Sequence, residues 1–365
     1  MINFRKLAGE NIASLVPYEP GKPVKELERE LGIKKAIKLA SNENPLGIPP
    51  KSKEALISFM DELNRYPLGD CYYLRQKLAI KLGVEKNNLL FGTGSNEIIE
   101  LLIKTFVKPG ENVVSFFPSF SVYGIIAQAN GSICKWVETD EDFKINFEKI
   151  INAIDENTKI VFLANPNNPT GTYFSYDNLI YFLNNIRDDI IVVLDEAYYE
   201  FVDAQDYPQS INLLNSYVNL FIMRTFSKAY GLAGFRIGYI IGNSEAIEML
   251  NRVRQPFNVN MAAQVAAEAA LEDHDFLRKV IKNNRDGKIY LYNEFKKLKL
   301  KYFETQANFI LVNVNDGKKI FNDLLHKGVI VRFLGPKLAP YIRVSIGLPK
   351  ENEIFIEKLK EVLEV

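Results

Sequence analysis

Patterns typical of buried strands alternate with amphipathic helix patterns through the first two thirds of this 365-residue chain. Short, almost continuous apolar runs are typical of strands that are buried on both faces, and segments with apolar residues at helical spacing separate them. This alternation predicts an α/β fold with a mostly parallel central sheet flanked by helices. The expected strands are 112–117, 159–164, 189–195, 218–226 and 236–242, and the clearest helices between them are 96–106 and 176–186.

The pattern changes after about residue 270, where a smaller α+β domain is expected. A long, highly charged amphipathic helix is predicted first, and shorter strands and helices alternate after it. We predict a large domain at 30–265 and a small domain formed by 1–29 together with 266–365. The expected elements of the small domain are helices 276–298, 316–327 and 350–363 and strands 309–314, 329–334 and 341–347.

Charge and composition restrict the classes of function. The 45 basic and 45 acidic residues balance, so we expect no nucleic-acid partner. No apolar run is long enough to span a bilayer and the N-terminus lacks the apolar core of a signal peptide, so we expect no membrane association and a cytoplasmic location. Two cysteines and two histidines are too few for a metal site or a histidine triad. The chemistry is therefore expected from Lys, Asp, Tyr, Arg or a bound cofactor.

Candidate residues follow the strand 218–226. Ser227 and Lys228 begin the segment SKAYGLAGFR, which ends at Arg236. Ligands of parallel sheets gather at the carboxyl ends of strands, and a lysine that is desolvated there has a lowered pKa and becomes nucleophilic. The guanidinium of Arg236 suits a phosphate. A solvated surface turn is the alternative for Ser-Lys alone, but the ten-residue context favours chemistry.

Two other strand ends carry further candidates. Asp195 closes its strand in the sequence DEAY, where a carboxylate can pair with a pyridine nitrogen and Tyr198 can hydrogen-bond a phenolic oxygen. The structural alternative for Asp195 is a helix N-cap. Asn168 lies in the turn NPNNPTG (165–171), whose prolines restrict the backbone and would fix this side chain at the edge of the sheet.

A candidate phosphate site precedes the helix at 96–106. The sequence FGTGSNE contains Gly94, Ser95 and Asn96, and backbone N–H groups at a helix N-terminus bind phosphate. Glu97 stands where a dinucleotide-binding fingerprint requires glycine, which disfavours a nicotinamide dehydrogenase. Tyr123, from FPSFSVY, is an aromatic residue that can either stack on a flat ring or pack in the core.

Taken together, these motifs resemble the fold-type I pyridoxal-phosphate-dependent transferases, and within them the chain is similar to the histidinol-phosphate aminotransferase family. The likeness runs from about residue 10 to the C-terminus and includes SNENPLG (41–47), NRYP (64–67) and RVSIG (343–347). The resemblance implies pyridoxal 5′-phosphate as cofactor. It also implies amino-group transfer between L-histidinol phosphate and 2-oxoglutarate or glutamate, in histidine biosynthesis.

The resemblance implies a role for each candidate near the cofactor. Lys228 would bind the cofactor covalently and then act as general base, and Asp195 would pair with the ring nitrogen. Tyr123 would stack on the ring, while Asn168 and Tyr198 would hydrogen-bond the phenolic oxygen. The residues expected to hold the phosphate group are Gly94, Ser95, Asn96, Ser227 and Arg236.

The remaining implied roles concern the substrate and a second subunit. Tyr66 would reach the cofactor phosphate of the neighbouring subunit, so a homodimer is expected. Arg343 would bind the anionic end of the substrate, and Arg332 and Tyr18 would favour a phosphate there. Two alternatives stay open within the same fold: a related enzyme acting on aromatic amino acids, and a threonine-phosphate decarboxylase. A regulatory protein that keeps this body is disfavoured by the balanced charge.

Overall fold

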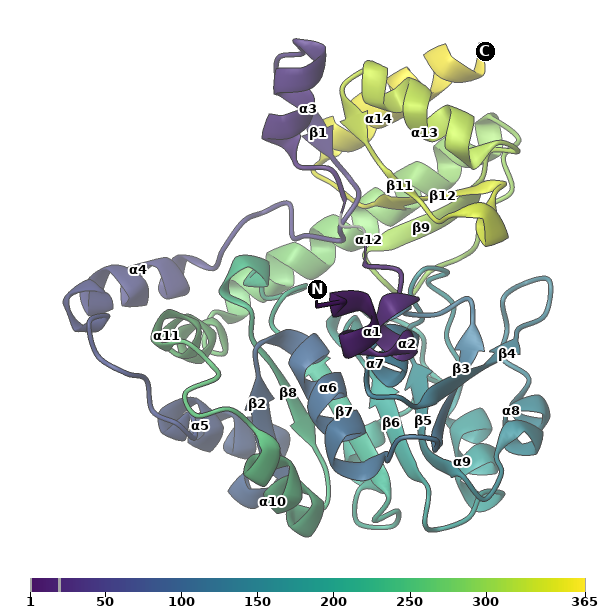
Figure 1. The fold of residues 1–365 in the computed structure, drawn as a ribbon. Coiled ribbons are helices and arrows are strands. Elements are labelled where there is room, and N and C mark those ends of the chain that lie inside the picture. Colours follow the sequence, from purple (N-terminus) through teal and green to yellow (C-terminus); the bar gives the residue numbers. More distant parts are fainter. Residues whose placement is uncertain (1, 19–20, 365) are drawn as a thin grey trace.

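A seven-stranded sheet forms the centre of the larger body in the computed structural model, which describes residues 2–18 and 21–364 (Figure 1). The strand order is β2-β8-β7-β6-β5-β3-β4, and neighbours are parallel except that β8 runs antiparallel to β2 and β7. The strands are β2 (Leu89–Gly92), β3 (Asn112–Phe117), β4 (Ile133–Glu138), β5 (Thr158–Ala164), β6 (Ile191–Asp195), β7 (Leu220–Thr225) and β8 (Gly238–Ile241).

Helices cover both faces of this sheet, because successive side chains of each buried strand point to opposite faces and both sets are apolar. On one face α6 (Gly94–Phe106), α7 (Val122–Ala129) and α10 (Ser244–Val253) contribute to one core cluster. The opposite face is covered by α5 (Tyr72–Leu82), α8 (Phe147–Ala153), α9 (Tyr176–Asn184) and α11 (Met261–Ala270). The helix α4 (Pro50–Phe59) lies beside α11, away from the sheet (Figure 1).

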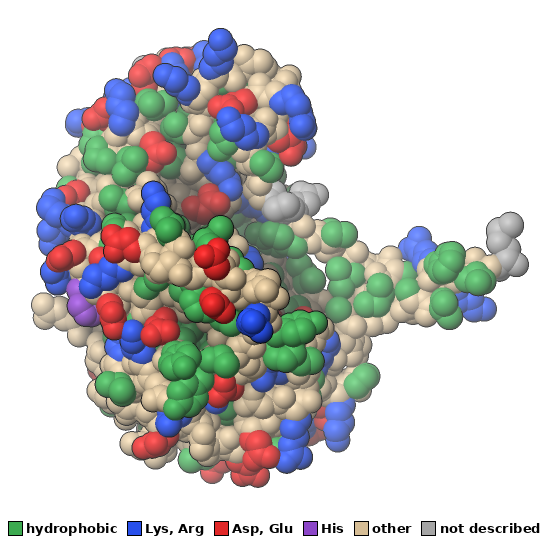
Figure 2. All heavy atoms as spheres, turned by 90° about the vertical axis from the view of Figure 1, so that its left-hand side faces the viewer, with side chains coloured by type: hydrophobic (Ala, Val, Ile, Leu, Met, Phe, Trp, Pro, Cys, Tyr) green, Lys and Arg blue, Asp and Glu red, His purple; other side chains and the backbone are tan. Residues whose placement is uncertain are grey.

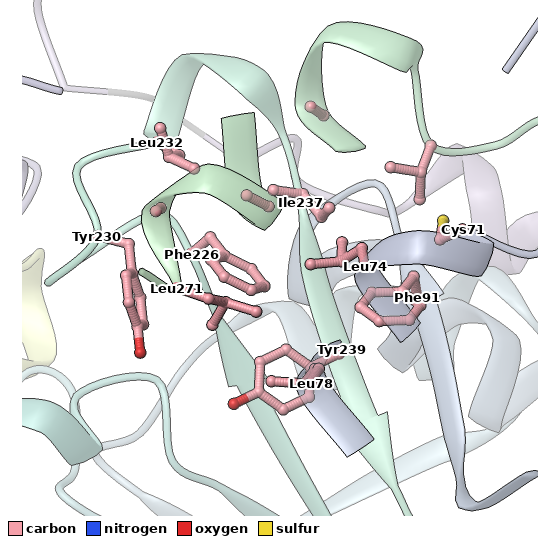
Figure 3. Packing of buried hydrophobic residues seen from close by; sticks show 14 of the residues in the cluster. Cys71, Leu74, Leu78, Phe91, Phe226, Tyr230, Leu232, Ile237, Tyr239 and Leu271 are labelled. Atoms are coloured by element: carbon pink, nitrogen blue, oxygen red, sulfur yellow. The ribbon is translucent and has the colours of Figure 1, made fainter. Parts of the chain in front are cut away.

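The turn after β7 is fixed by buried apolar side chains. Figure 3 shows Phe226, Leu232 and Ile237 of this segment together with Leu74 of α5 and Phe91 of β2 in one cluster. Phe226 and Leu232 are fully buried, so moving the turn would expose apolar surface to water. The core therefore determines the position of the residues that follow Phe226, among them Ser227 and Lys228.

The smaller body lies above the sheet in Figure 1. The expected strand 329–334 is divided at Val331, because its first part pairs with a strand from the N-terminal region and its second part with the C-terminal hairpin partner. The elements of this body are α3 (Val24–Leu31), β1 (Ile37–Lys38), α12 (His274–Lys297), β9 (Phe309–Asn313), α13 (Gly317–His326), β10 (Val329–Ile330), β11 (Arg332–Phe333), β12 (Tyr341–Ser345) and α14 (Pro349–Leu363).

The N-terminal region is shared between the two bodies. Strand β1 pairs with β10 and α3 packs against the same body, so the chain from α3 to about residue 38 belongs to the smaller body. The helices α1 (Phe4–Ala8) and α2 (Glu10–Ala13) instead lie near α7, where Asn11 and Gln128 exchange hydrogen bonds. We therefore propose that the first domain boundary lies near residue 40 rather than at 30.

Candidate active site

One cavity of about 420 Å³ brings together most of the residues selected from the sequence. Ala164, Asp195 and Thr225 line it, so it lies at the carboxyl ends of β5, β6 and β7, where ligands of parallel sheets bind. Gly94 and Tyr123 do not line the cavity, but Gly94 contacts Arg236 and the Tyr123 hydroxyl bonds Asp195, and both of these partners do line it. The selected residues that line the cavity are Tyr18, Ser95, Asn96, Asn168, Asp195, Tyr198, Ser227, Lys228, Arg236, Arg332 and Arg343.

The amine of Lys228 lies in the middle of this arrangement. Its Nζ donates a hydrogen bond to the carbonyl oxygen of Ser41 at 3.2 Å and lies 5.8 Å from the ring centre of Tyr198. Burial lowers the pKa of Lys228 from its usual value to about 8, and the positive charge of Arg343 acts in the same direction. A much larger fraction of this amine is therefore neutral, and nucleophilic, near pH 8 than in an exposed lysine.

Asp195 lies at the floor of the cavity. Its Oδ2 accepts a hydrogen bond from the Tyr123 hydroxyl at 2.6 Å, and its Oδ1 accepts one from the backbone N–H of Ala197 at 3.2 Å. Burial raises the pKa of Asp195 to about 6, and the bond from Tyr123 opposes that rise. A buried carboxylate is stable in its charged form only when an opposite charge lies beside it, and a protonated ring nitrogen of a ligand would provide that charge.

Of the two possibilities left open for Tyr123, the structure shows core packing and not the ring-stacking role that the resemblance implied. Tyr123 is fully buried, and its ring stacks on Phe162 with 4.6 Å between ring centres and planes 5° apart. A ligand in the cavity therefore does not meet that face. Phe120 lines the cavity and meets Tyr123 edge to face at 5.7 Å. Phe120 was overlooked although it stands in the same sequence segment, three residues before Tyr123.

The start of α6 forms an anion cradle with Arg236. The backbone of Gly94 has a φ of +72°, and a Cβ there would lie 2.5 Å from Nη2 of Arg236, so glycine allows the guanidinium to approach. Ser95 Oγ is buried and has no hydrogen-bond partner within the described chain. A helix N-terminus, a guanidinium and an unpaired hydroxyl together fit a phosphate group.

The other end of the cavity is cationic. Arg343 is buried, and its Nη1 and Nη2 donate to Asn168 Oδ1 and to the carbonyl oxygen of Ala40, both at 2.5 Å. Its Nε is buried without a partner among residues 2–18 and 21–364. Arg332 lies over the ring of Tyr18, with 5.8 Å between the guanidinium carbon and the ring centre. These groups are suited to an anionic substrate.

Asn168 and Tyr198 are held by other polar residues of the site. The amide oxygen of Asn168 accepts from Arg343, and the hydroxyl of Tyr198 accepts a hydrogen bond from Asn42 Nδ2 at 3.0 Å. Asn42 is buried and also bonds Ser345, so it links the two bodies beside the cavity. The motif SNENPLG includes Asn42, but the sequence predicted no role for this residue.

Tyr66 lies outside the cavity of its own chain. Its side chain is 81% exposed and its ring stacks on Phe257, with 4.8 Å between ring centres. Within the described residues, no group of three or more His, Cys, Asp and Glu side chains is placed to hold a metal ion. The described helices include none that is long and apolar enough to cross a membrane.

Comparison with known proteins yields one family. Residues 34–359 match the model of the family Aminotransferase class I and II. The histidinol-phosphate aminotransferase of Moorella thermoacetica is 47% identical over 358 residues, which cover 97% of this chain and 92% of that protein. That of Caldicellulosiruptor saccharolyticus is 43% identical over 359 residues, 97% of this chain and 99% of the relative. The crystal structure of histidinol-phosphate aminotransferase from Sinorhizobium meliloti in complex with pyridoxal-5′-phosphate is similar with a TM-score of 0.90, 27% identity and 97% of each chain covered.

Proposed function

This chain belongs to the class I and II aminotransferases, and we propose that it moves an amino group between L-histidinol phosphate and 2-oxoglutarate. Its cofactor is pyridoxal 5′-phosphate, as in the related structure. The observation that supports the substrate best is that Arg332, Arg343 and Tyr18 line the same cavity as Lys228, where the two guanidinium groups suit an anionic group of the substrate. We place the reaction in histidine biosynthesis because histidinol phosphate already carries the imidazole ring, the amino group and the carbon skeleton of histidine.

The residues present fit the cofactor. The unpaired Ser95 hydroxyl and the cradle of Gly94 and Arg236 suit its phosphate, and Asp195 suits its ring nitrogen. When bound, the cofactor supplies an electron sink for the bond-breaking step at the substrate amine carbon. We propose that Asn96 and Ser227 complete the phosphate site, since both line the cavity beside this cradle.

We assign the stacking role to Phe120 instead of Tyr123. Phe120 presents its side chain to the cavity, whereas Tyr123 is covered by Phe162. The role of Tyr123 then becomes indirect: its hydroxyl holds Asp195 and keeps the pKa of that carboxyl lower than burial alone would leave it. An ionised Asp195 is the form that pairs with a protonated ring nitrogen.

Proton transfer falls to Lys228. Its lowered pKa makes it a competent base near neutral pH, and it lines the cavity in which we propose that the substrate binds. Arg343 would fix the anionic end of the substrate, and its bond to Asn168 couples that end to the cofactor site. Tyr198 and Asn168 would hydrogen-bond the phenolic oxygen of the cofactor. Because one site must accept an amino donor and then an oxo-acid acceptor in turn, ping-pong kinetics are expected.

We further propose a homodimer in which Tyr66 reaches the partner's cavity. Figure 2 shows the face that carries α4, α5 and α11, with apolar side chains spread over it. Exposed apolar side chains that gather on one face are suited to protein association. The exposed apolar residues of α4, α5 and the segment between them are Ile57, Met60, Leu63, Tyr66, Leu68, Tyr72, Tyr73 and Ile80. The expected cytoplasmic location stays a prediction, which cell fractionation would test.

The deciding experiment is a titration of the purified holoenzyme with L-histidinol phosphate, followed by the near-visible absorption of the cofactor. We expect the absorption band of the lysine-bound form to disappear, and 2-oxoglutarate to restore it. A band that ignores histidinol phosphate but responds to aromatic amino acids would reassign the substrate. Release of carbon dioxide from threonine phosphate without 2-oxoglutarate would instead identify a decarboxylase.

A further inference from the structure

One carboxylate of the cavity wall has no part in the roles assigned above. Among the described residues that line the cavity, the carboxylates are those of Asp195 and Glu43. Asp195 lies at the floor and is bonded by its neighbours. The Glu43 side chain is 47% exposed, and its Oε1 accepts a hydrogen bond from Lys38 Nζ at 3.0 Å. A carboxylate offers about four acceptor positions, so Glu43 keeps capacity for a ligand.

The segment that carries Glu43 is clamped to the catalytic lysine turn. The Ser41 carbonyl oxygen accepts from Lys228 Nζ, and Asn44 Nδ2 donates to the carbonyl oxygen of Ala229 at 2.9 Å. Asn42 between them donates to the Tyr198 hydroxyl. The side chain of Glu43 takes no part in this clamp, yet its negative charge acts on Lys228 and partly offsets the lowering of the lysine pKa. Glu43 is therefore held at a fixed place near the reacting centre.

We propose that Glu43 recognises the imidazole ring of the substrate by accepting a hydrogen bond from an imidazole N–H. The inference rests on the proposed function, because it takes L-histidinol phosphate as the substrate. The amine-bearing carbon of that molecule carries a phosphate arm and an imidazole arm. With the amine at Lys228 and the phosphate between Arg332 and Arg343, the imidazole arm must meet another part of the wall. A carboxylate there matches a ring that donates, and it binds the imidazolium form more strongly.

The same residue would separate the two amino donors of the reaction. Glutamate has no N–H group on its side chain and carries a carboxylate, which gains nothing from Glu43. Loss of the Glu43 charge is therefore expected to weaken the reaction with histidinol phosphate and to spare the reaction with glutamate. A residue that acted solely by positioning Lys228 would affect both reactions alike.

The test is the Glu43→Gln holoenzyme, in which each half-reaction is followed separately by the absorption of the cofactor. We expect kcat/KM for histidinol phosphate to fall about tenfold, while kcat/KM for glutamate stays within about twofold. The difference between wild type and variant should widen as the pH falls through about 6.5, the usual pKa of an imidazole, because more of the substrate is then cationic.

Lys38→Met is the matched control, since it removes the partner of Glu43 and leaves the carboxylate. We expect it to change neither half-reaction more than about twofold. Equal losses in both half-reactions of Glu43→Gln, or a Lys38→Met variant with the same selective defect, would overturn the inference. So would a working wild type whose Glu43→Gln variant is unchanged. A wild type that ignores histidinol phosphate would overturn the proposed function itself, which makes the two failures distinguishable.

Discussion

Arg332 on β11 and Arg343 on β12 are directly opposite each other in the antiparallel pairing of the smaller body. Like charges directly opposite each other disfavour strand pairing, so this placement of two arginines serves a purpose other than sheet stability. Both side chains line the cavity, and Arg343 is the one that is also bonded to Asn168. The two arginines thus have different neighbours: Arg343 is hydrogen-bonded to Asn168, whereas Arg332 lies over the ring of Tyr18.

Replacing Arg332 should affect the phosphate-bearing substrate most. We expect Arg332→Gln to raise KM for histidinol phosphate by about 10- to 100-fold, because a charge-assisted contact to phosphate is lost, and to raise KM for glutamate by less. Steady-state kinetics with each donor measures this. Lys337→Gln is a suitable control, since Lys337 lies over the ring of Phe117 and does not line the cavity. An equal rise for both donors would contradict a phosphate-selective role.

Removing the Tyr123 hydroxyl should act through Asp195. The hydrogen bond from Tyr123 lowers the pKa of Asp195 against the effect of burial, so in Tyr123→Phe that pKa rises. A group with a raised pKa becomes protonated at higher pH, so the acidic limb of kcat/KM should move up by roughly one pH unit, given the strength of one hydrogen bond. The ring stacking on Phe162 is retained in this variant. A pH profile identical to that of wild type would show that Tyr123 serves packing alone.

The lowered pKa of Lys228 predicts how the cofactor-free enzyme captures its cofactor. The reactive form is the neutral amine, and its fraction rises as the pH passes upward through about 8. We therefore expect the rate of reconstitution with pyridoxal 5′-phosphate to increase up to about that pH and then to level off. An ordinary lysine would keep accelerating toward pH 10.4. Stopped-flow absorption of the purified apoenzyme at several pH values distinguishes the two.

A buried ion pair next to the candidate active site should contribute strongly to the free energy of unfolding of this protein. The side chains of Arg224 and Glu196 are almost fully buried, Nε and Nη2 of the arginine lie 2.9 and 2.8 Å from Glu196 Oε2, and Ser210 Oγ donates to the carboxylate at 2.6 Å. Arg224→Met leaves Glu196 buried without its counter-charge. We expect the free energy of unfolding to fall by about 3–5 kcal/mol in urea titrations.

The control for that measurement is an exposed pair in the same domain. Arg187 and Asp189 form a solvent-exposed ion pair whose side chains are 44% and 68% exposed. Arg187→Gln should therefore change the unfolding free energy by less than about 1 kcal/mol. Similar losses in the two variants would contradict the argument that burial makes the Arg224–Glu196 pair costly to break.

The sequence predicted the parts of the fold whose patterns are local. The buried strands β3, β5, β6 and β7 and the helices α6, α9, α12 and α14 lie within a few residues of the expected positions, and the α/β fold of this family is confirmed. Strand β4 was missed because it is a partly exposed edge strand whose apolar residues are interrupted by Lys135, so it lacks a continuous apolar run. The antiparallel direction of β8 was not predictable, since an apolar run carries no information on its direction.

The site was predictable where a residue follows a strand, and less so where a turn orients it. Lys228 and Asp195 line the cavity as expected because strand ends fix their place. Both Phe120 and Tyr123 are aromatic, so the sequence alone does not show which of them reaches the cavity. Helix α7 begins at Val122, and this places the side chain of Tyr123 in the core. The contribution of Asn42 depends on contacts across two bodies, which a single sequence does not reveal.

The homodimer can be tested by combining two defective subunits. If Tyr66 completes the partner's site, each active site takes Lys228 from one subunit and Tyr66 from the other. Lys228→Ala then inactivates the site of its own subunit, and Tyr66→Ala impairs the site of its partner. Coexpression of the two chains should then create mixed dimers in which one of the two sites is intact. About half of the dimers are mixed in an equal coexpression, so roughly a quarter of wild-type activity is expected.

The control pairs Lys228→Ala with Asp195→Asn. Both residues line the same cavity of one chain, so a mixed dimer of these two variants contains no intact site. Activity should therefore stay at the background of the separate variants. Recovery in the Tyr66 combination but not in the Asp195 combination is what a shared site requires, because Tyr66 is exposed on its own chain and does not line the candidate active site there. If neither combination recovers activity, Tyr66 does not act across the interface.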